Sequence, residues 1–419
     1  MAGDLTSNWA GLHRYRAARI HQPATIDEVR RLVAGARRVR ALGSRHSFNA
    51  VADSEDGDLI WLGRIPARIA VDRDRMEVIV GGGATYAELG AELEGQGLAL
   101  HNLASLPHVT VAGAIATGTH GSGDGNGNLA TAVRGLELVR PDGTLAQVVR
   151  DDPDWGAFPV ALGYLGLVTR VTLAVQPSFR VRQHVYRDVP WEEVLGRFDE
   201  VMGGGYSVSV FTRWQGPAVE QVWCKSVDAS TEPVPVQRFG GVLSPVTHTV
   251  GALEGSNVTA RDGSPGPWWL RLPHFRPDGR PSFGDEVQSE YLVGRAQAAA
   301  ALAAVRALAD RIEPLLLVTE LRTVAADELW LSPMYERPTL AIHFTWRKDP
   351  VRVRALLPEI ERALAPFAAR PHWGKVFAME GRDLRSRYPL LPRFRDLARR
   401  WDPDGTFSND YYRTYLQEA

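Results

Sequence analysis

The first 177 residues alternate between segments with a helical period of apolar residues and short apolar runs that end at glycines. TIDEVRRLVAGARR (25–38) has helical spacing, with Thr25 placed as an N-cap. VRALGS (39–44) predicts a short strand entering a turn, and MEVIVGGGATYAEL (76–89) a strand, a glycine turn and a helix that begins near Thr85. A hairpin around residues 141–143 and a strand near residues 167–177 follow.

After Pro177 the pattern changes to longer alternating segments. YSVSVFTRW (206–214), VEQVWCKSV (219–227) and DEVQSEYLV (285–293) predict strands with one exposed face, and residues 239–280 predict long loops. The chain then predicts a helix (294–312), two strands (315–324 and 339–347) and another helix (353–367). This order favours a mixed sheet with helices on one face.

The length of 419 residues exceeds what one hydrophobic core usually serves. We therefore expect an α+β protein with one domain over residues 1–177 and a second, with a mixed or antiparallel sheet covered by helices, over residues 178–370. Residues 371–419 predict a C-terminal segment that returns toward the first domain.

Charge and composition restrict the partners. The formal net charge is -1, so no global field attracts nucleic acid or an anionic membrane surface. No apolar stretch approaches the roughly 20 residues that cross a bilayer, and the N-terminus has no signal-peptide pattern. The single cysteine, Cys224, cannot form an internal disulfide. We expect a cytoplasmic protein, and a monomer.

Two strands carry polar side chains at alternate positions. Glu320 and Arg322 share one face of the strand 315–324, and His343 and Thr345 share one face of the strand 339–347. A solvated face with cross-strand ion pairs is one interpretation. The mixture of an acid, a fixed cation, an imidazole and a hydroxyl favours the other, a site for a polyhydroxylated ligand.

A lysine follows in the segment RPHWGKV (370–376). Only three of the 48 basic residues are lysine, and one of them, Lys375, stands beside Trp373 and Gly374. An ammonium near an aromatic wall can be desolvated and its pKa lowered, although a surface lysine after a turn would give the same pattern.

The glycine-rich segments match neither a P-loop nor a dinucleotide fingerprint between a strand and a helix. His46, in ALGSRHSFN (41–49), is compatible with a turn residue, a metal ligand, a base or an attachment point. His46, His101, His108 and His120 lack the spacing of a metal site, so we expect no metal.

The series LGSRHSF, GGGATYAELG, NLASLPHVTVAGAIATGTHGSG and LGYLGLVT resembles the FAD-binding (PCMH-type) domain of the vanillyl-alcohol-oxidase superfamily. RTV, HFTW and RPHWGK resemble its sugar-alcohol and aldonolactone branch, and the resemblance extends over residues 8–409. It implies FAD bound in the first domain, a substrate (cap) domain after it, and a covalent bond from His46 to the flavin. The residues that it implies for the cofactor are Gly43, Ser44, Arg45, His46, Ser47, Ser105, Thr110, Gly113, Thr117, Gly118, His120, Gly163, Gly166 and Val168.

The same resemblance implies substrate contacts from Ser105, Glu320, Arg322, Thr345 and Lys375, with His343 beside them. It implies oxidation of the terminal primary alcohol of an alditol, such as xylitol or sorbitol, by hydride transfer to flavin N5, with O2 reduced to hydrogen peroxide. The catalytic candidates are Lys375, His343 and Arg322, and the sequence leaves the base open between Lys375 and His343. An oxidase or dehydrogenase of gulono- or galactono-1,4-lactone is the nearest alternative, and a non-catalytic nucleotide- or carbohydrate-binding protein is another.

Overall fold

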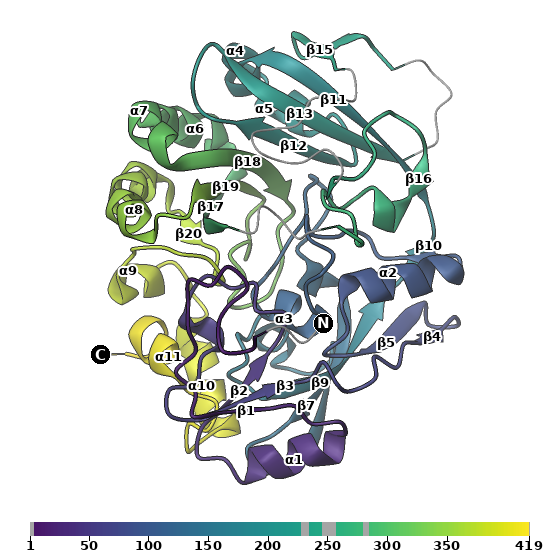
Figure 1. The fold of residues 1–419 in the computed structure, drawn as a ribbon, viewed down its shortest axis with the longest axis vertical. Coiled ribbons are helices and arrows are strands. Elements are labelled where there is room, and N and C mark those ends of the chain that lie inside the picture. Colours follow the sequence, from purple (N-terminus) through teal and green to yellow (C-terminus); the bar gives the residue numbers. More distant parts are fainter. Residues whose placement is uncertain (1–3, 228–233, 245–256, 280–284, 419) are drawn as a thin grey trace.

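The computed structural model describes residues 4–227, 234–244, 257–279 and 285–418. Two groups of β-sheets lie one above the other in Figure 1; some helices cover their outer sides, and α2 (Tyr86–Gly95) and α3 (Val111–Ala116) lie between the two groups. Residues before Pro177 form the lower group, and later residues form the large upper sheet. The sheets thus separate along the chain near the proposed boundary at residue 177.

The lower group consists of a parallel sheet of three strands and an antiparallel sheet of five. In sheet order the first contains β1 (Arg19–His21), β3 (Asp58–Trp61) and β2 (Val39–Leu42). The second contains β4 (Ala70–Asp72), β5 (Glu77–Gly81), β9 (Leu167–Ala174), β7 (Val133–Val139) and β8 (Leu145–Val149). A small ladder joins β6 (Leu98–Ala99) to β10 (Gln176–Pro177).

The upper sheet has ten strands, and its ladders are antiparallel throughout the described residues, so the expected mixed sheet is antiparallel. In sheet order it contains β14 (Gln237–Arg238), β15 (Gly241–Leu243), β11 (Arg180–Pro190), β13 (Ala218–Val227), β12 (Ser207–Thr212), β18 (Leu316–Val324), β19 (Thr339–Arg347), β17 (Glu286–Gly294) and β20 (Arg370–Pro371). A further strand, β16 (Gly266–Pro267), pairs with β11.

Two helices of the first domain begin where the sequence predicts them. Thr25 accepts a hydrogen bond at the start of α1 (Ile26–Ala34), and Thr85 forms a capping box with Glu88 at the start of α2 (Tyr86–Gly95). The other helices are α3 (Val111–Ala116), α4 (Trp191–Gly196), α5 (Phe198–Met202), α6 (Ala298–Arg306), α7 (Ala309–Ile312), α8 (Pro350–Leu364), α9 (Gly381–Arg385), α10 (Leu391–Trp401) and α11 (Asp410–Tyr415).

The outer face of the upper sheet packs against α4, α6 and α8 through an apolar core. Leu340, Ile342, Phe344 and Trp346 supply the face of β19 in this core, as the period of two predicts. In β18 the predicted alternation holds from Val318 onward. A register irregularity between Leu316 and Val318 interrupts the alternation, so Leu316 lies in the same apolar core although strict alternation would place it on the face of Glu320.

The opposite face of this sheet is buried too, so the prediction of strands with an exposed face is wrong. All six residues of β12 and eight of the nine in β17 are buried. The sequence pattern alternates as it would on a wet face, but residues 257–279 and the first domain cover it. The expected loops at 239–280 hold two short strands, β15 and β16, and residues 245–256 and 280 of that prediction lie outside the described residues.

The C-terminal segment lies against the N-terminal strands at the lower left of Figure 1. Asn409 Nδ2 donates to Asp53 O over 2.9 Å, and Arg40 Nη1 donates to Phe407 O over 2.9 Å. Arg40 also donates to the carbonyls of Leu162 and Gly163, and so ties the C-terminus to the turn before β9. These buried bonds fix the loops of the first domain that face the upper sheet.

Candidate active site

Three neighbouring strands of the upper sheet bring a row of polar side chains to one cavity. In the register of the sheet, His343 on β19 lies opposite Glu320 of β18 on one side and opposite Glu290 of β17 on the other. Side chains at directly paired positions lie roughly 5 Å apart, so the two carboxylates flank the imidazole. All three line the same cavity.

Lys375 reaches this row from the edge of the sheet. Strand β20 pairs with β17, and the chain then turns so that Val376 N donates to Gln288 O over 2.9 Å. Lys375 Nζ donates to Glu290 Oε2 over 2.7 Å and to His343 Nδ1 over 2.5 Å. The structure therefore brings both candidate bases together, in direct contact.

Electrostatics keeps the carboxylates ionised and the imidazole neutral. Burial alone would raise the pKa of Glu290, but Lys375, Arg322 and His120 lower it well below its usual value. Arg322 and His274 likewise lower the pKa of Glu320 against the effect of burial.

Burial and the charge of Lys375 lower the pKa of His343 to about 4. Burial also lowers the pKa of Lys375, and Glu290 opposes that shift.

Arg322 joins the row to the glycine-rich loops of the first domain. Its Nη2 lies 2.7 Å from Glu290 Oε1, and its Nη1 donates to Ser105 Oγ over 3.4 Å and to His120 O over 3.3 Å. Thr345 completes the group, because its hydroxyl lies 3.1 Å from His343 Nε2. The five proposed substrate residues thus surround one end of the cavity.

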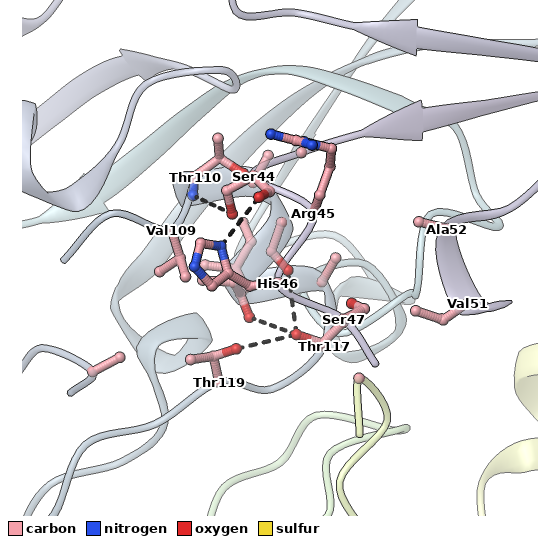
Figure 2. A pocket seen from close by; sticks show the side chains of 18 of the residues that line it. Ser44, Arg45, His46, Ser47, Val51, Ala52, Val109, Thr110, Thr117 and Thr119 are labelled. Carbon is pink, nitrogen blue, oxygen red and sulfur yellow. Dashed lines mark hydrogen bonds between the residues drawn. The ribbon is translucent and has the colours of Figure 1, made fainter. Parts of the chain in front are cut away.

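The same cavity continues into the first domain, between the turn after β2 and the segment that contains α3. Figure 2 shows these two segments converging, with Ser44 and His46 from one and Thr110, Thr117 and Thr119 from the other. Thr110 N donates to Ser44 Oγ over 3.3 Å, and the hydroxyls of Thr117 and Thr119 lie 3.1 Å apart.

His46 lies in this part of the cavity with one ring nitrogen free. Its Nδ1 lies 3.1 Å from Ser44 O, so the proton on Nδ1 is fixed there and Nε2 retains its lone pair. Nε2 is buried without a hydrogen-bond partner among the described residues. Burial lowers the pKa of His46 to about 4, and the ring stacks on Trp9 at 5.1 Å between centroids. A neutral, oriented imidazole is the nucleophilic form.

The walls of the cavity pack closely on one another at two glycines and leave buried polar atoms of the described residues unpaired. A Cβ added to Gly43 would lie 2.6 Å from Thr110 Oγ1, and one added to Gly82 would lie 2.6 Å from Val168 O. Thr110 Oγ1 is buried and, like His46 Nε2, lacks a partner within the described chain. The two glycines let the loops of the wall approach each other closely, and the unpaired polar atoms are what an extended nucleotide cofactor such as FAD would satisfy.

All but one of the proposed cofactor residues line the cavity. The exception is Gly118, whose α-carbon faces Pro333 instead, with 3.3 Å from an added Cβ to Pro333 Cδ. Its φ of +67° shows that it serves the turn after α3 and not the wall.

The prediction missed several polar residues of the site. Glu290 and Gln288 lie on β17, whose polar face was expected in solvent. His274 comes from residues predicted as loop, and His372 from the turn before Lys375. The alternation of Glu286, Gln288 and Glu290 was the available signal, but the pairing of β17 beside β19 is not visible in local sequence.

Among the described residues, no group of three or more histidine, cysteine, aspartate or glutamate side chains is arranged to hold a metal ion. No helix in the described ranges combines the length and apolar character needed to cross a bilayer. Cys224 is buried in the core, and burial raises its pKa to about 12.

Comparisons with known proteins agree with this arrangement. Residues 17–148 match the family described as FAD binding domain, and residues 285–415 match D-arabinono-1,4-lactone oxidase. Alditol oxidase of a Streptomyces species is 45% identical over 412 residues, which cover 98% of each chain. L-gulono-1,4-lactone dehydrogenase of Mycobacterium tuberculosis is 30% identical, over 98% of this chain and 99% of that protein.

Among solved structures, cholesterol oxidase from B. sterolicum shares the fold, with a TM-score of 0.80 and 16% identity over 98% of this chain and 96% of that one. The fold and the cavity define an FAD-dependent oxidoreductase. The chain belongs to the vanillyl-alcohol-oxidase-type family of FAD-linked oxidases that includes alditol oxidase.

Proposed function

We propose that this protein oxidises the terminal primary alcohol of alditols such as xylitol and sorbitol to the aldose and reduces O2 to H2O2. The observation that carries the proposal is the buried group of Glu320, Arg322, His343, Thr345 and Lys375 at one end of a cavity whose other end is lined by glycine loops. The 45% identity to alditol oxidase supports the same substrate class. When bound, FAD supplies the two-electron acceptor for the hydride that leaves the alcohol carbon.

Several hydrogen-bonding groups suit a chain of hydroxyls. Ser105, Glu320 and Thr345 line the cavity around Arg322 and present acceptors and donors to successive hydroxyl groups. Such a site rejects ligands that leave its buried polar groups unpaired. We assign to Arg322 the role of holding the reacting oxygen, because its guanidinium is fixed by Glu290 over 2.7 Å.

We assign the base to Lys375 in preference to His343. The Nδ1 atom of His343 accepts from Lys375, and its Nε2 faces Thr345, so neither nitrogen is free to take a proton. In its neutral form Lys375 donates its two N–H groups to Glu290 and His343 and keeps its lone pair, and burial lowers its pKa. A neutral Lys375 can accept the hydroxyl proton as the hydride leaves.

The proposal includes a covalent bond between His46 and the flavin. The free Nε2 lone pair and the neutral ring are the features that support it. The proposal also divides the chain into domains at residues 1–177 and 178–370 and a C-terminal segment at 371–419. We further propose that the protein is a monomer in the cytoplasm. Size-exclusion chromatography of the purified protein is the first check of the monomer.

The deciding experiment combines colour and turnover. Purified protein is precipitated with acid, and we expect the yellow colour to remain with the pellet. Xylitol and sorbitol are then compared with gulono- and galactono-1,4-lactone, with peroxide as the readout. We expect peroxide from the polyols.

Other outcomes assign other functions. Preference for the lactones would favour the aldonolactone alternative, which the match of residues 285–415 to D-arabinono-1,4-lactone oxidase supports. Turnover that requires an artificial dye would show that O2 is not the electron acceptor. A yellow protein that oxidises none of these compounds would favour the alternative of a non-catalytic binding protein. A colourless protein would refute the FAD assignment.

A further inference from the structure

A second buried lysine stands behind the proposed substrate site. Lys225 on β13 is only 1% exposed and does not line the cavity. It extends from the face of the sheet opposite the helices and lies under residues 272–274. Its Nζ donates to Leu272 O, and His274 Nδ1 lies 3.0 Å away.

His274 links this lysine to Glu320. Its Nε2 lies 2.6 Å from Glu320 Oε1. The ring is held between Phe211 and Trp223, at 5.6 Å and 5.0 Å between centroids. Burial lowers the pKa of Lys225 to about 7, but its Nζ carries N–H groups in either charge state. The ionised Glu320 only accepts, so the ring proton lies on Nε2 and Nδ1 accepts from Lys225.

The carboxylate of Glu320 is thereby oriented. Both the His274 contact and the 3.6 Å contact from Arg322 Nε fall on Oε1. Oε2 has no hydrogen-bond partner within the described ranges, and Glu320 lines the cavity. One oxygen of the carboxylate is therefore held by protein, and the other is left for a ligand.

We infer that Lys225 is a positioning residue: it fixes the tautomer of His274, which holds Glu320 Oε1 and leaves Oε2 to accept a hydrogen bond from a substrate hydroxyl. This inference rests on the proposed polyol function. A bond to an ionised acceptor contributes strongly to binding, so loss of the relay weakens polyol binding about tenfold to a hundredfold. The kcat changes less, because Lys225 touches neither substrate nor flavin.

The test is a double-mutant cycle on the holoenzyme. Lys225→Met removes the donor. His274→Gln keeps an amide N–H that can donate to Glu320. Because the amide has no second tautomer, this donor does not depend on Lys225. We expect Lys225→Met to raise the KM for xylitol about tenfold or more in the wild-type background, and to leave it within twofold in the His274→Gln background. Lys348→Met is the matched control, since Lys348 lies at the surface beside Asp285 over 2.8 Å, and its KM is expected to equal that of the wild type.

Two results overturn the inference. One is a KM for Lys225→Met within twofold of wild type in an enzyme that oxidises xylitol. The other is an equal rise in both backgrounds, which would mean that Lys225 merely supports the chain at residues 272–274.

A direct measurement keeps the inference separate from the proposed function and from folding of the variants. The ¹⁵N spectrum of histidine-labelled wild-type protein, with His274 assigned by its loss in His274→Gln, reports the tautomer. A proton on Nδ1 in the wild type refutes the relay. A proton on Nε2 is also what the Glu320 carboxylate imposes, so the same spectrum of Lys225→Met decides: a loss of the Nε2-protonated form supports the relay, and an unchanged tautomer refutes it. If the wild type does not oxidise xylitol, the polyol proposal fails, and the tautomer still decides whether Lys225 acts on His274.

Discussion

Lys375 and Glu290 form a buried ion pair with 2.7 Å between Nζ and Oε2, although they are 85 positions apart in sequence. Glu290 is 1% exposed and also binds Arg322 through its other oxygen, over 2.7 Å. One carboxylate therefore contacts both the permanent cation Arg322 and the proposed base Lys375. Its position opposite His343 on the neighbouring strand fixes all three side chains together.

Replacing Glu290 with glutamine is expected to destabilise the protein by about 3 kcal/mol or more. The substitution keeps the size of the side chain but removes the negative charge that faces the buried Arg322 guanidinium and Lys375. The midpoint of urea unfolding of the holoprotein measures the loss. The same variant should reduce its flavin much more slowly with xylitol, because Arg322 and Lys375 lose their common anchor.

Glu313→Gln serves as the control for removing a glutamate charge. Glu313 pairs with Arg213 over 2.7 Å, but both side chains are partly exposed, at 36% for Arg213 and 41% for Glu313. Such pairs contribute less than about 1 kcal/mol. Equal unfolding midpoints for Glu290→Gln and Glu313→Gln would show that Glu290 does not stabilise the fold by compensating buried positive charge.

Lys375→Met is expected to slow anaerobic reduction of the flavin by xylitol about 10²- to 10⁴-fold, the usual effect of removing a general base. Stopped-flow absorbance at 450 nm, a general flavin band, follows the reaction. Lys375→Arg should be similarly slow, because a guanidinium keeps the positive charge but cannot accept a proton. A reduction rate near that of wild type in Lys375→Met would eliminate the lysine as base.

His46→Ala is expected to retain FAD without a covalent bond. Intact-protein mass spectrometry under denaturing conditions should show the flavin mass on the wild type and its absence from the variant. His184→Ala is the control, since His184 lies on β11, outside the cavity. Retention of the flavin mass in His46→Ala would place the attachment elsewhere.

The sequence predicted one half of the polar row at the site. The period of two in β18 and β19 is local, so it was enough to place Glu320 and Arg322 on one face and His343 and Thr345 on another. The pairing of these two strands also follows from their short separation in the chain. The structure adds that this face is covered by protein and lines a cavity.

The other half depends on long-range pairing. Glu290 reaches the row because β17 inserts between β19 and β20, an order that no local pattern specifies. His274 arrives from an irregular segment, and Lys225 from a strand that looked half-solvated. An alternating strand has the same sequence pattern whether its polar face meets water or a buried site, so only the packed structure separates the two.

Gly82→Ala tests whether the first domain needs close backbone contact at the cavity. An added methyl would lie 2.6 Å from the carbonyl oxygen of Val168, which is backbone and cannot rotate away. We expect a destabilisation of about 1–3 kcal/mol together with weaker retention of FAD. Thermal unfolding and the ratio of flavin to protein absorbance measure the two effects. Gly125→Ala is the matched control, because no atom lies within 4 Å of its added Cβ, and it should behave as wild type.

Stability should fall in acid partly because His343 and His274 are buried as neutral rings. Burial lowers the pKa of each to about 4, against 6.5 for an ordinary histidine. Between these values the unfolded chain binds more protons than the folded one, so the free energy of unfolding decreases as pH falls from about 6.5 to about 4. The contribution of each ring over that interval is on the order of 3 kcal/mol.

His343→Gln isolates this contribution from the carboxylates that also protonate in acid. Glutamine retains a donor and an acceptor but does not titrate, so the plot of unfolding free energy against pH should be shallower than that of wild type between pH 6.5 and 4. Urea unfolding of the holoprotein at several pH values gives both slopes. Parallel plots would mean that His343 carries the same proton in the folded and unfolded states, and its neutral role beside Lys375 would have to be abandoned.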